Sequence, residues 1–130
     1  MKMKTTMILA AVAALSLTGC GAASFKAEGT MTLGIDGVTQ YAPGGGDCDG
    51  TGGYDDITPG AQVVIKAGGS TVGKGSLGEG KYDDGWCQFS FSISDVKGGS
   101  DFYSVEVANR GTIEYTEDEL KKGVKLSLGS

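Results

Sequence analysis

Apolar and polar residues alternate along several short stretches of the chain, most regularly over residues 86–93. Cys87, Phe89, Phe91 and Ile93 are apolar there, and the residues between them are glutamine and serine. A period of two predicts a strand with one face in a core and the other in water. Less regular stretches predict further strands over residues 28–35, 61–67, 71–77, 102–108, 112–115 and 124–128.

Turn residues separate these stretches. About seven short strands with turn signals every 8–12 residues or so predict an all-β fold, either an antiparallel sandwich or a small barrel. One short helix is expected near residues 117–122, because Thr116 and Glu119 have the spacing of a capping box. Asp36-Gly37 predicts a hairpin turn after the first strand.

Part of this pattern is similar to a known group of β modules. Residues 61–128 contain a strand, a glycine turn, and the segments FSF at 89–91 and YSVEV at 103–107. In this they resemble prealbumin-like and other immunoglobulin-like sandwich modules. The resemblance implies two packed sheets and implies no activity.

The N-terminus has the composition of an export signal. Lys2 and Lys4 precede an apolar run over residues 7–17, and small residues follow it. The run is about 11 residues long, whereas a membrane-spanning helix needs about 20. Residues 17–20 (LTGC) resemble the lipobox of bacterial lipoproteins. That resemblance implies cleavage before Cys20 and attachment of lipid to its side chain.

These features divide the chain into three parts. They are a signal peptide over residues 1–19 that is removed, the lipidated Cys20 with a short tether to residue 27, and a β-sandwich domain over residues 28–130. The expected location is the bacterial cell envelope, where the N-terminal lipid holds the protein on the extracytoplasmic side of a membrane. Loss of Lys2 and Lys4 would change the formal charge from −5 to −7. This acidic balance argues against a nucleic-acid partner.

Cys48 and Cys87 are expected to form a disulfide, because export places them in an oxidising compartment. Two free thiols or half of a metal site are the alternatives. The chain contains no histidine, so a Ser-His-Asp or Cys-His site cannot be built in its usual form. We assign no catalytic residue and expect a protein that is not an enzyme.

One glycine-rich loop contains acidic residues at spacings similar to those of a calcium-binding EF-hand loop. Four oxygen-bearing residues stand at positions 1, 3, 5 and 9 of an EF-hand-like loop: Asp47, Asp49, Thr51 and Asp55. Gly52 occupies position 6, but position 12 is Thr58 instead of a bidentate glutamate. A turn solvated by its own aspartates is the alternative explanation. A thermal midpoint that is unchanged by calcium or by a chelator would refute calcium binding.

Five residues are candidates for contact with a partner: Tyr41, Tyr54, Tyr82, Trp86 and Arg110. The tyrosines fall in or beside loops, and the chain has one tryptophan and one arginine, residue types that are frequent at binding hot spots. We therefore expect a membrane-anchored, non-enzymatic envelope lipoprotein that binds an envelope or extracellular protein or glycan through loops around residues 41–56 and 80–86. A calcium-stabilised binding module and a surface inhibitor or phage-exclusion lipoprotein are the alternatives.

Overall fold

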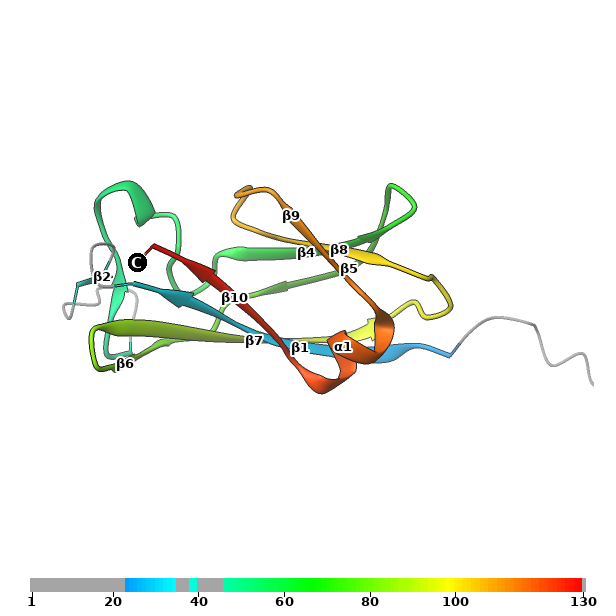
Figure 1. The fold of residues 1–130 in the computed structure, drawn as a ribbon, viewed down its shortest axis with the longest axis horizontal. Helices are drawn as coiled ribbons and strands as arrows, with labels where there is room; N and C mark the ends of the chain where they lie inside the picture. Colours follow the sequence, from blue (N-terminus) through cyan, green and yellow to red (C-terminus); the bar gives the residue numbers. More distant parts are fainter. Residues whose placement is uncertain (1–22, 35–37, 40–45, 130) are drawn as a thin grey trace, which may run out of the picture.

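The computed structural model describes residues 23–34, 38–39 and 46–129 (Figure 1). Two four-stranded sheets pack face to face, which confirms the predicted all-β sandwich. The first sheet has the order β10-β1-β7-β6 and consists of β1 (Phe25–Leu33), β6 (Gly80–Asp83), β7 (Trp86–Val96) and β10 (Val124–Leu128). The second has the order β5-β4-β8-β9 and consists of β4 (Gln62–Ala67), β5 (Ser70–Ser76), β8 (Tyr103–Val107) and β9 (Thr112–Tyr115).

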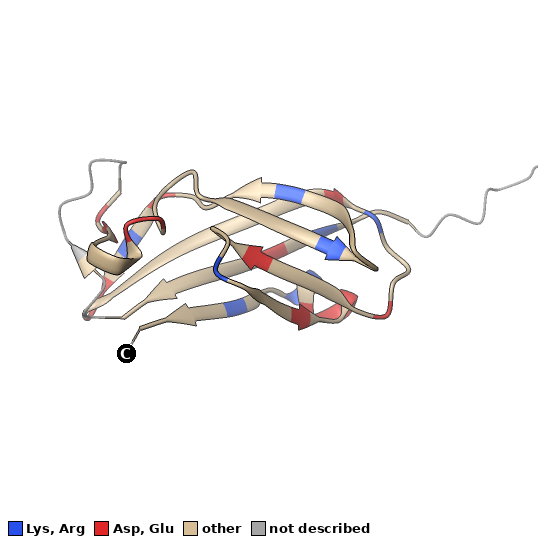
Figure 2. Ribbon diagram, turned by 90° about the horizontal axis from the view of Figure 1, so that it is seen from above, with Lys and Arg blue, Asp and Glu red and all other residues tan. Residues whose placement is uncertain are grey.

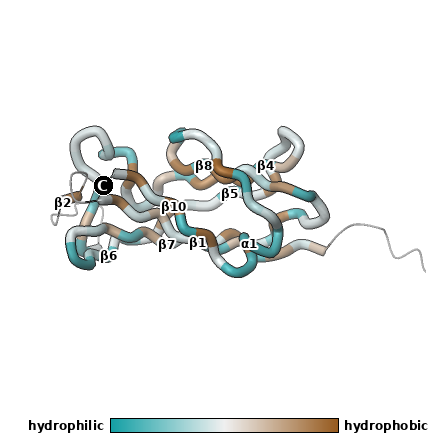
Figure 3. Tube along the Cα trace, in the orientation of Figure 1, coloured by the Kyte–Doolittle hydropathy of each residue, from teal (hydrophilic) through white to brown (hydrophobic). Residues whose placement is uncertain are grey.

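The core lies between the inner faces of the two sheets. In β7 the residues Cys87, Phe89, Phe91 and Ile93 are buried, and the polar residues between them are exposed, as the alternation predicts. The second sheet contributes Val63 and Ile65 of β4, together with the inner residues of β8. Figure 3 shows hydrophobic positions along the strands and hydrophilic ones at the turns and on the short helix.

Strand β1 differs from the prediction in its start and in its neighbours. It begins at Phe25, and both Phe25 and Ala27 are buried. The strand therefore starts three residues before the predicted start at residue 28. Strand β1 pairs with β7 in the antiparallel sense and with β10 in the parallel sense, so the first sheet is mixed. Alternation along a single strand carries no information on the direction of its neighbour.

The predicted hairpin after this strand is not formed in the expected way. Its turn, Asp36-Gly37, lies outside the described residues. The segment that follows, β2 (Val38–Thr39), pairs with β3 (Asp49–Gly50) in a small separate ladder, while β1 pairs with β10 and β7. Strand β6 was not predicted, because only one of its four residues, Tyr82, is a large apolar residue, which is too few to show a period of two.

The one α-helix of the described residues, α1 (Glu117–Lys122), confirms the capping-box prediction. The Glu119 backbone N–H donates to Thr116 Oγ1 at 3.2 Å, and the Thr116 N–H donates to the Glu119 carboxylate at 2.8 Å. Leu120 is buried against the first sheet and fixes the helix there. Across the part of the chain that the structure describes, no helix is both long and apolar enough to cross a membrane.

Candidate functional site

The two ends of the sandwich differ in what they present. Strand β1 runs from one end to the other, and its nine residues span about 26 Å at ~3.3 Å per residue (Figure 1). We call the end at Phe25 the proximal end and the end at Leu33 the distal end. Leu33 pairs with Cys87, whereas Phe25 pairs with Val96. Trp86, next to Cys87, therefore lies at the distal end.

A tight hairpin presents the aromatic residues of the distal end. Asp84 and Gly85 both have positive φ, as a two-residue type I′ turn requires, and Asp-Gly is a preferred pair for that turn. The turn places Asp83 opposite Trp86 on the outer face of the first sheet. Tyr82 pairs with Cys87 and so faces the opposite side of the hairpin. Trp86 and Tyr82 are each 39 % exposed, so both rings are available to a partner.

Beside the Trp86 ring, the outer face of the first sheet has a shallow hollow. Its lining combines one aromatic ring with hydroxyl, amide, ammonium and carboxylate groups, from Thr32, Lys81, Asp83, Asp84, Trp86 and Gln88. Such a mixture suits a half-wet contact, in which a ring supplies apolar area and its neighbours supply hydrogen bonds. Sequence reasoning identified Trp86 and placed Lys81, Asp83 and Asp84 in the loop around residues 80–86, but it missed Thr32 and Gln88. The dipeptide Asp84-Gly85, a hairpin signal, could have placed Gln88 opposite Lys81, whereas Thr32 comes from a strand distant in the sequence.

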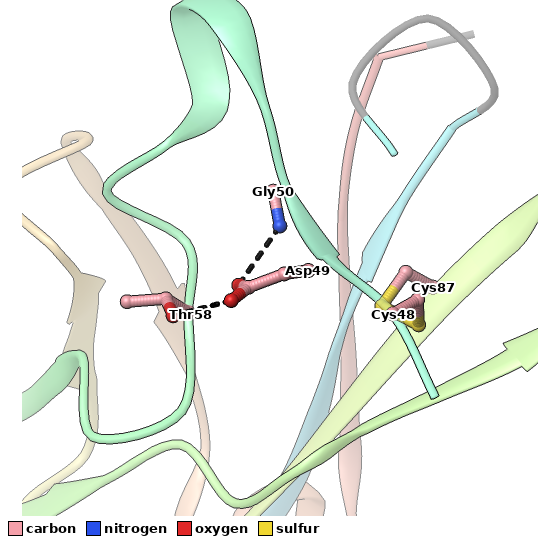
Figure 4. Close-up of a disulfide and its surroundings, with 5 residues drawn as sticks. All are labelled: Cys48, Asp49, Gly50, Thr58 and Cys87. Carbon is pink, nitrogen blue, oxygen red and sulfur yellow. Dashed lines mark hydrogen bonds between the residues drawn. A yellow bond between two sulfur atoms is a disulfide. The ribbon is translucent and has the colours of Figure 1, made fainter. Parts of the chain in front are cut away.

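The disulfide joins this hairpin to the preceding loop. Cys48 and Cys87 are bonded, as predicted, and both are fully buried (Figure 4). The Asp47 N–H also donates to the Gly80 carbonyl at 2.8 Å. A Cβ atom at Gly80 would overlap the Cys48 carbonyl and crowd the Cys87 sulfur, so only glycine allows this approach. Loop and hairpin therefore form one covalently linked unit.

Asp49 has a structural role within this loop. Its side chain is buried, and its carboxylate accepts hydrogen bonds from the Gly50 N–H and from Thr58 Oγ1, each at 3.0 Å (Figure 4). The other predicted calcium ligands, Asp47, Thr51 and Asp55, are exposed. Within residues 23–34, 38–39 and 46–129 there is no group of three acidic, histidine or cysteine side chains placed to hold a metal. Calcium binding by this loop stays a prediction.

Arg110 in the turn between β8 and β9 contacts Tyr54 in the loop over residues 51–56. The Arg110 guanidinium donates from Nε to the Asp56 carboxylate at 2.8 Å, forms a second bond to that carboxylate, and also donates to the Gly53 carbonyl. It lies over the Tyr54 ring, 5.2 Å from the ring centroid. These contacts tie the β8–β9 turn to the loop, so Arg110 has a structural role in addition to its predicted role in partner contact. Asp56 was missed, because it lies 54 positions before Arg110 in the sequence.

The Asp56–Arg110 pair gives a prediction for acid stability. The hydrogen bond from Arg110 lowers the pKa of Asp56 below its ordinary value of 3.8. The pair therefore stabilises the fold above the unfolded pKa and loses this effect as the pH falls through the folded pKa. Because the pair is partly exposed, Asp56→Asn should cost about 1 kcal/mol or less at pH 7. The thermal midpoints of wild type and variant should converge as the pH falls below the folded pKa of Asp56.

Asp55→Asn is the matched control, since Asp55 is the exposed neighbour of Asp56. We expect Asp55→Asn to leave the midpoint at pH 7 nearly unchanged, as a typical surface substitution does. An Asp56→Asn variant with the wild-type midpoint at pH 7 would contradict the structural role of the pair.

Two predicted residues, Cys20 and Tyr41, lie outside the described residues. Of the other candidates, the structure brings Tyr54 to Arg110, and it places Tyr82 and Trp86 on one hairpin. Comparison of the chain with models of known families, with curated proteins and with solved structures found no match. A functional proposal for this protein therefore depends on the geometry of the distal end and on the sequence of the N-terminus.

Proposed function

We propose that this chain is a lipid-anchored, non-enzymatic protein of the bacterial cell envelope, and that the distal end of its β domain binds an envelope or extracellular partner. One observation carries the proposal. The chain reaches the domain at the proximal end, while the exposed aromatic rings of the disulfide-linked hairpin are at the distal end. An anchor on Cys20 would therefore leave Trp86 and Tyr82 at the end of the domain that is farther from the membrane.

The length of the linking segment supports this arrangement. Ala23 lies three positions after Cys20, a reach of at most about 11 Å when fully extended. The proximal end would be held at the lipid headgroups, and the distal end would stand roughly 26 Å further out. A recognition surface at that distance is accessible to soluble and envelope-bound partners alike.

The construction of the distal end supports recognition rather than catalysis. The chain has no histidine, and the acidic residues of the hairpin, Asp83 and Asp84, belong to a tight turn. The disulfide and the two-residue turn hold Trp86 and Tyr82 in place before any partner binds. A pre-organised surface loses little conformational entropy on association.

Photocrosslinking in intact cells tests the recognition surface. A photoreactive residue at position 82 should capture a defined envelope component, and one at Lys66 should not, because Lys66 lies in β4 toward the proximal end. Trp86→Ala should weaken the capture from position 82 about thirtyfold, because a hot-spot residue contributes about 2 kcal/mol or more to binding. Equal capture from positions 82 and 66, or none from position 82, would contradict the proposal.

A further inference from the structure

The loop over residues 97–102 lies directly beside the point where the chain enters the domain. A Cβ atom at Gly98 would overlap the Ala23 carbonyl oxygen and crowd the Glu117 carboxylate. Phe25, two residues after Ala23, packs edge-on against Tyr103 with 5.4 Å between the ring centroids. In Figure 1 the yellow loop and the blue start of β1 lie at the same end of the sandwich. The loop therefore contacts a residue only three positions from Cys20.

Side chains from β8 and α1 hold this loop in place. Tyr103 is fully buried, and its hydroxyl donates to the Lys97 carbonyl at 3.0 Å and accepts from the Ser100 N–H at 3.2 Å. The Gly99 N–H donates to the Glu117 carboxylate at 3.0 Å. Hydrogen bonds from Lys121 and Gly99 lower the pKa of Glu117, which keeps this acceptor ionised. The loop is a fixed part of the proximal end.

This fixed loop exposes a large apolar side chain. Phe102 is 61 % exposed, the highest value for a large apolar residue in the part of the chain that the structure describes. The alternation of β8 buries Tyr103 and directs its neighbour Phe102 to the outer face. Isolated exposed apolar residues are common on protein surfaces, so exposure alone identifies no site. The position of Phe102 relative to the predicted lipid anchor is what gives it significance.

We propose that Phe102 inserts into the interfacial region of the membrane beside the lipidated Cys20, as a second contact that fixes the orientation of the domain. The inference rests on the lipid anchor of the proposed function. The reach of at most about 11 Å from Cys20 to Ala23 confines the 97–102 loop to the zone of the headgroups. The apolar face of an amphipathic helix on a membrane surface enters that zone to a depth of about 5–10 Å, and we expect Phe102 to lie within the same zone.

The charges of the loop favour an apolar contact over an electrostatic one. Lys97 and Asp101 carry opposite charges in the same exposed loop, and charges of both signs occur at this end in Figure 2. A polybasic hold on anionic lipid needs a cluster of cations instead. We therefore expect the contact of Phe102 with the bilayer to be insensitive to salt and to the fraction of anionic lipid.

Tryptophan fluorescence of the reconstituted, lipidated protein tests the inference. The native Trp86 reports on the distal end, and a Phe102→Trp, Trp86→Phe double variant reports on the 97–102 loop. Both proteins are extracted from membranes, reconstituted into phosphatidylcholine vesicles, and compared with vesicles whose acyl chains are brominated. We expect a blue shift and bromine quenching at position 102, unchanged in high salt, and neither effect at position 86.

The possible outcomes separate the inference from the proposed function. If intact mass shows lipid on Cys20 and position 102 is not quenched, the membrane contact is wrong and the lipid anchor stands. Equal quenching at positions 102 and 86 would also overturn the inference, because the domain would then lie flat. A chain without lipid on Cys20 would refute both the anchor and the contact.

Discussion

Removing the Cys48–Cys87 disulfide is expected to lower the free energy of unfolding by about 4 kcal/mol. The bond joins residues that are 39 positions apart, and the loop that it closes contains β3, β4, β5 and β6. In the chain-entropy account, opening a loop of this size gives the unfolded chain many more conformations. The loss is large against the roughly 5–15 kcal/mol that stabilises a typical domain.

Thermal and urea denaturation of the oxidised protein and of the Cys48→Ala, Cys87→Ala double variant measure this effect. At about 4–8 °C per kcal/mol, the thermal midpoint should fall by roughly 15–30 °C. Cys20→Ala with the disulfide intact is the matched control, because it replaces the third cysteine of the chain, which precedes the described domain. A double variant that melts within a few degrees of this control would contradict the account.

Replacing Cys20 should release the protein from the membrane almost completely. Each buried CH₂ of an acyl chain contributes about 0.8 kcal/mol, and stable anchoring needs two chains or a chain with a second contact. Without Cys20, the remaining attachment would be Phe102, a single side chain at the proximal end. Expressed behind a signal peptide whose cleavage does not need Cys20, the Cys20→Ala variant should therefore appear in the soluble extracytoplasmic fraction instead of the membrane pellet.

Ser24→Ala is the control for this experiment. It changes another small polar residue of the segment between Cys20 and β1, and the protein should remain in the membrane pellet. If the Cys20→Ala variant stayed in the pellet after washing at high salt and high pH, the membrane attachment would not depend on Cys20.

Much of the fold could be predicted, because the buried face of a strand follows from the order of apolar and polar residues within that strand. Alternation identified β7 and β8 with their buried faces, and the capping box identified α1. The parallel pairing of β1 with β10 could not be predicted, since it joins segments from the two ends of the chain. The start of β1 was missed because the residues before it, Gly21, Ala22 and Ala23, are small and suggest a tether.

The candidate site was harder to predict than the fold. Residue types identified Trp86 and Tyr82, but only the register of β6 with β7 shows that they face opposite sides of one hairpin. The burial of Asp49 is a tertiary effect, since its acceptor role depends on Thr58 nine residues later. For Arg110, residue type indicated a contact, and the structure adds the partner that holds it, Asp56.

Intact mass spectrometry of the native protein, extracted from membranes, tests the central claim most directly. The account predicts a chain that begins at Cys20 and carries a diacylglycerol and acyl chains. It also predicts that reduction adds the mass of two hydrogen atoms, as the opening of the Cys48–Cys87 bond requires. A full-length chain that carries no lipid and gains no mass on reduction would contradict both the anchor and the oxidising location.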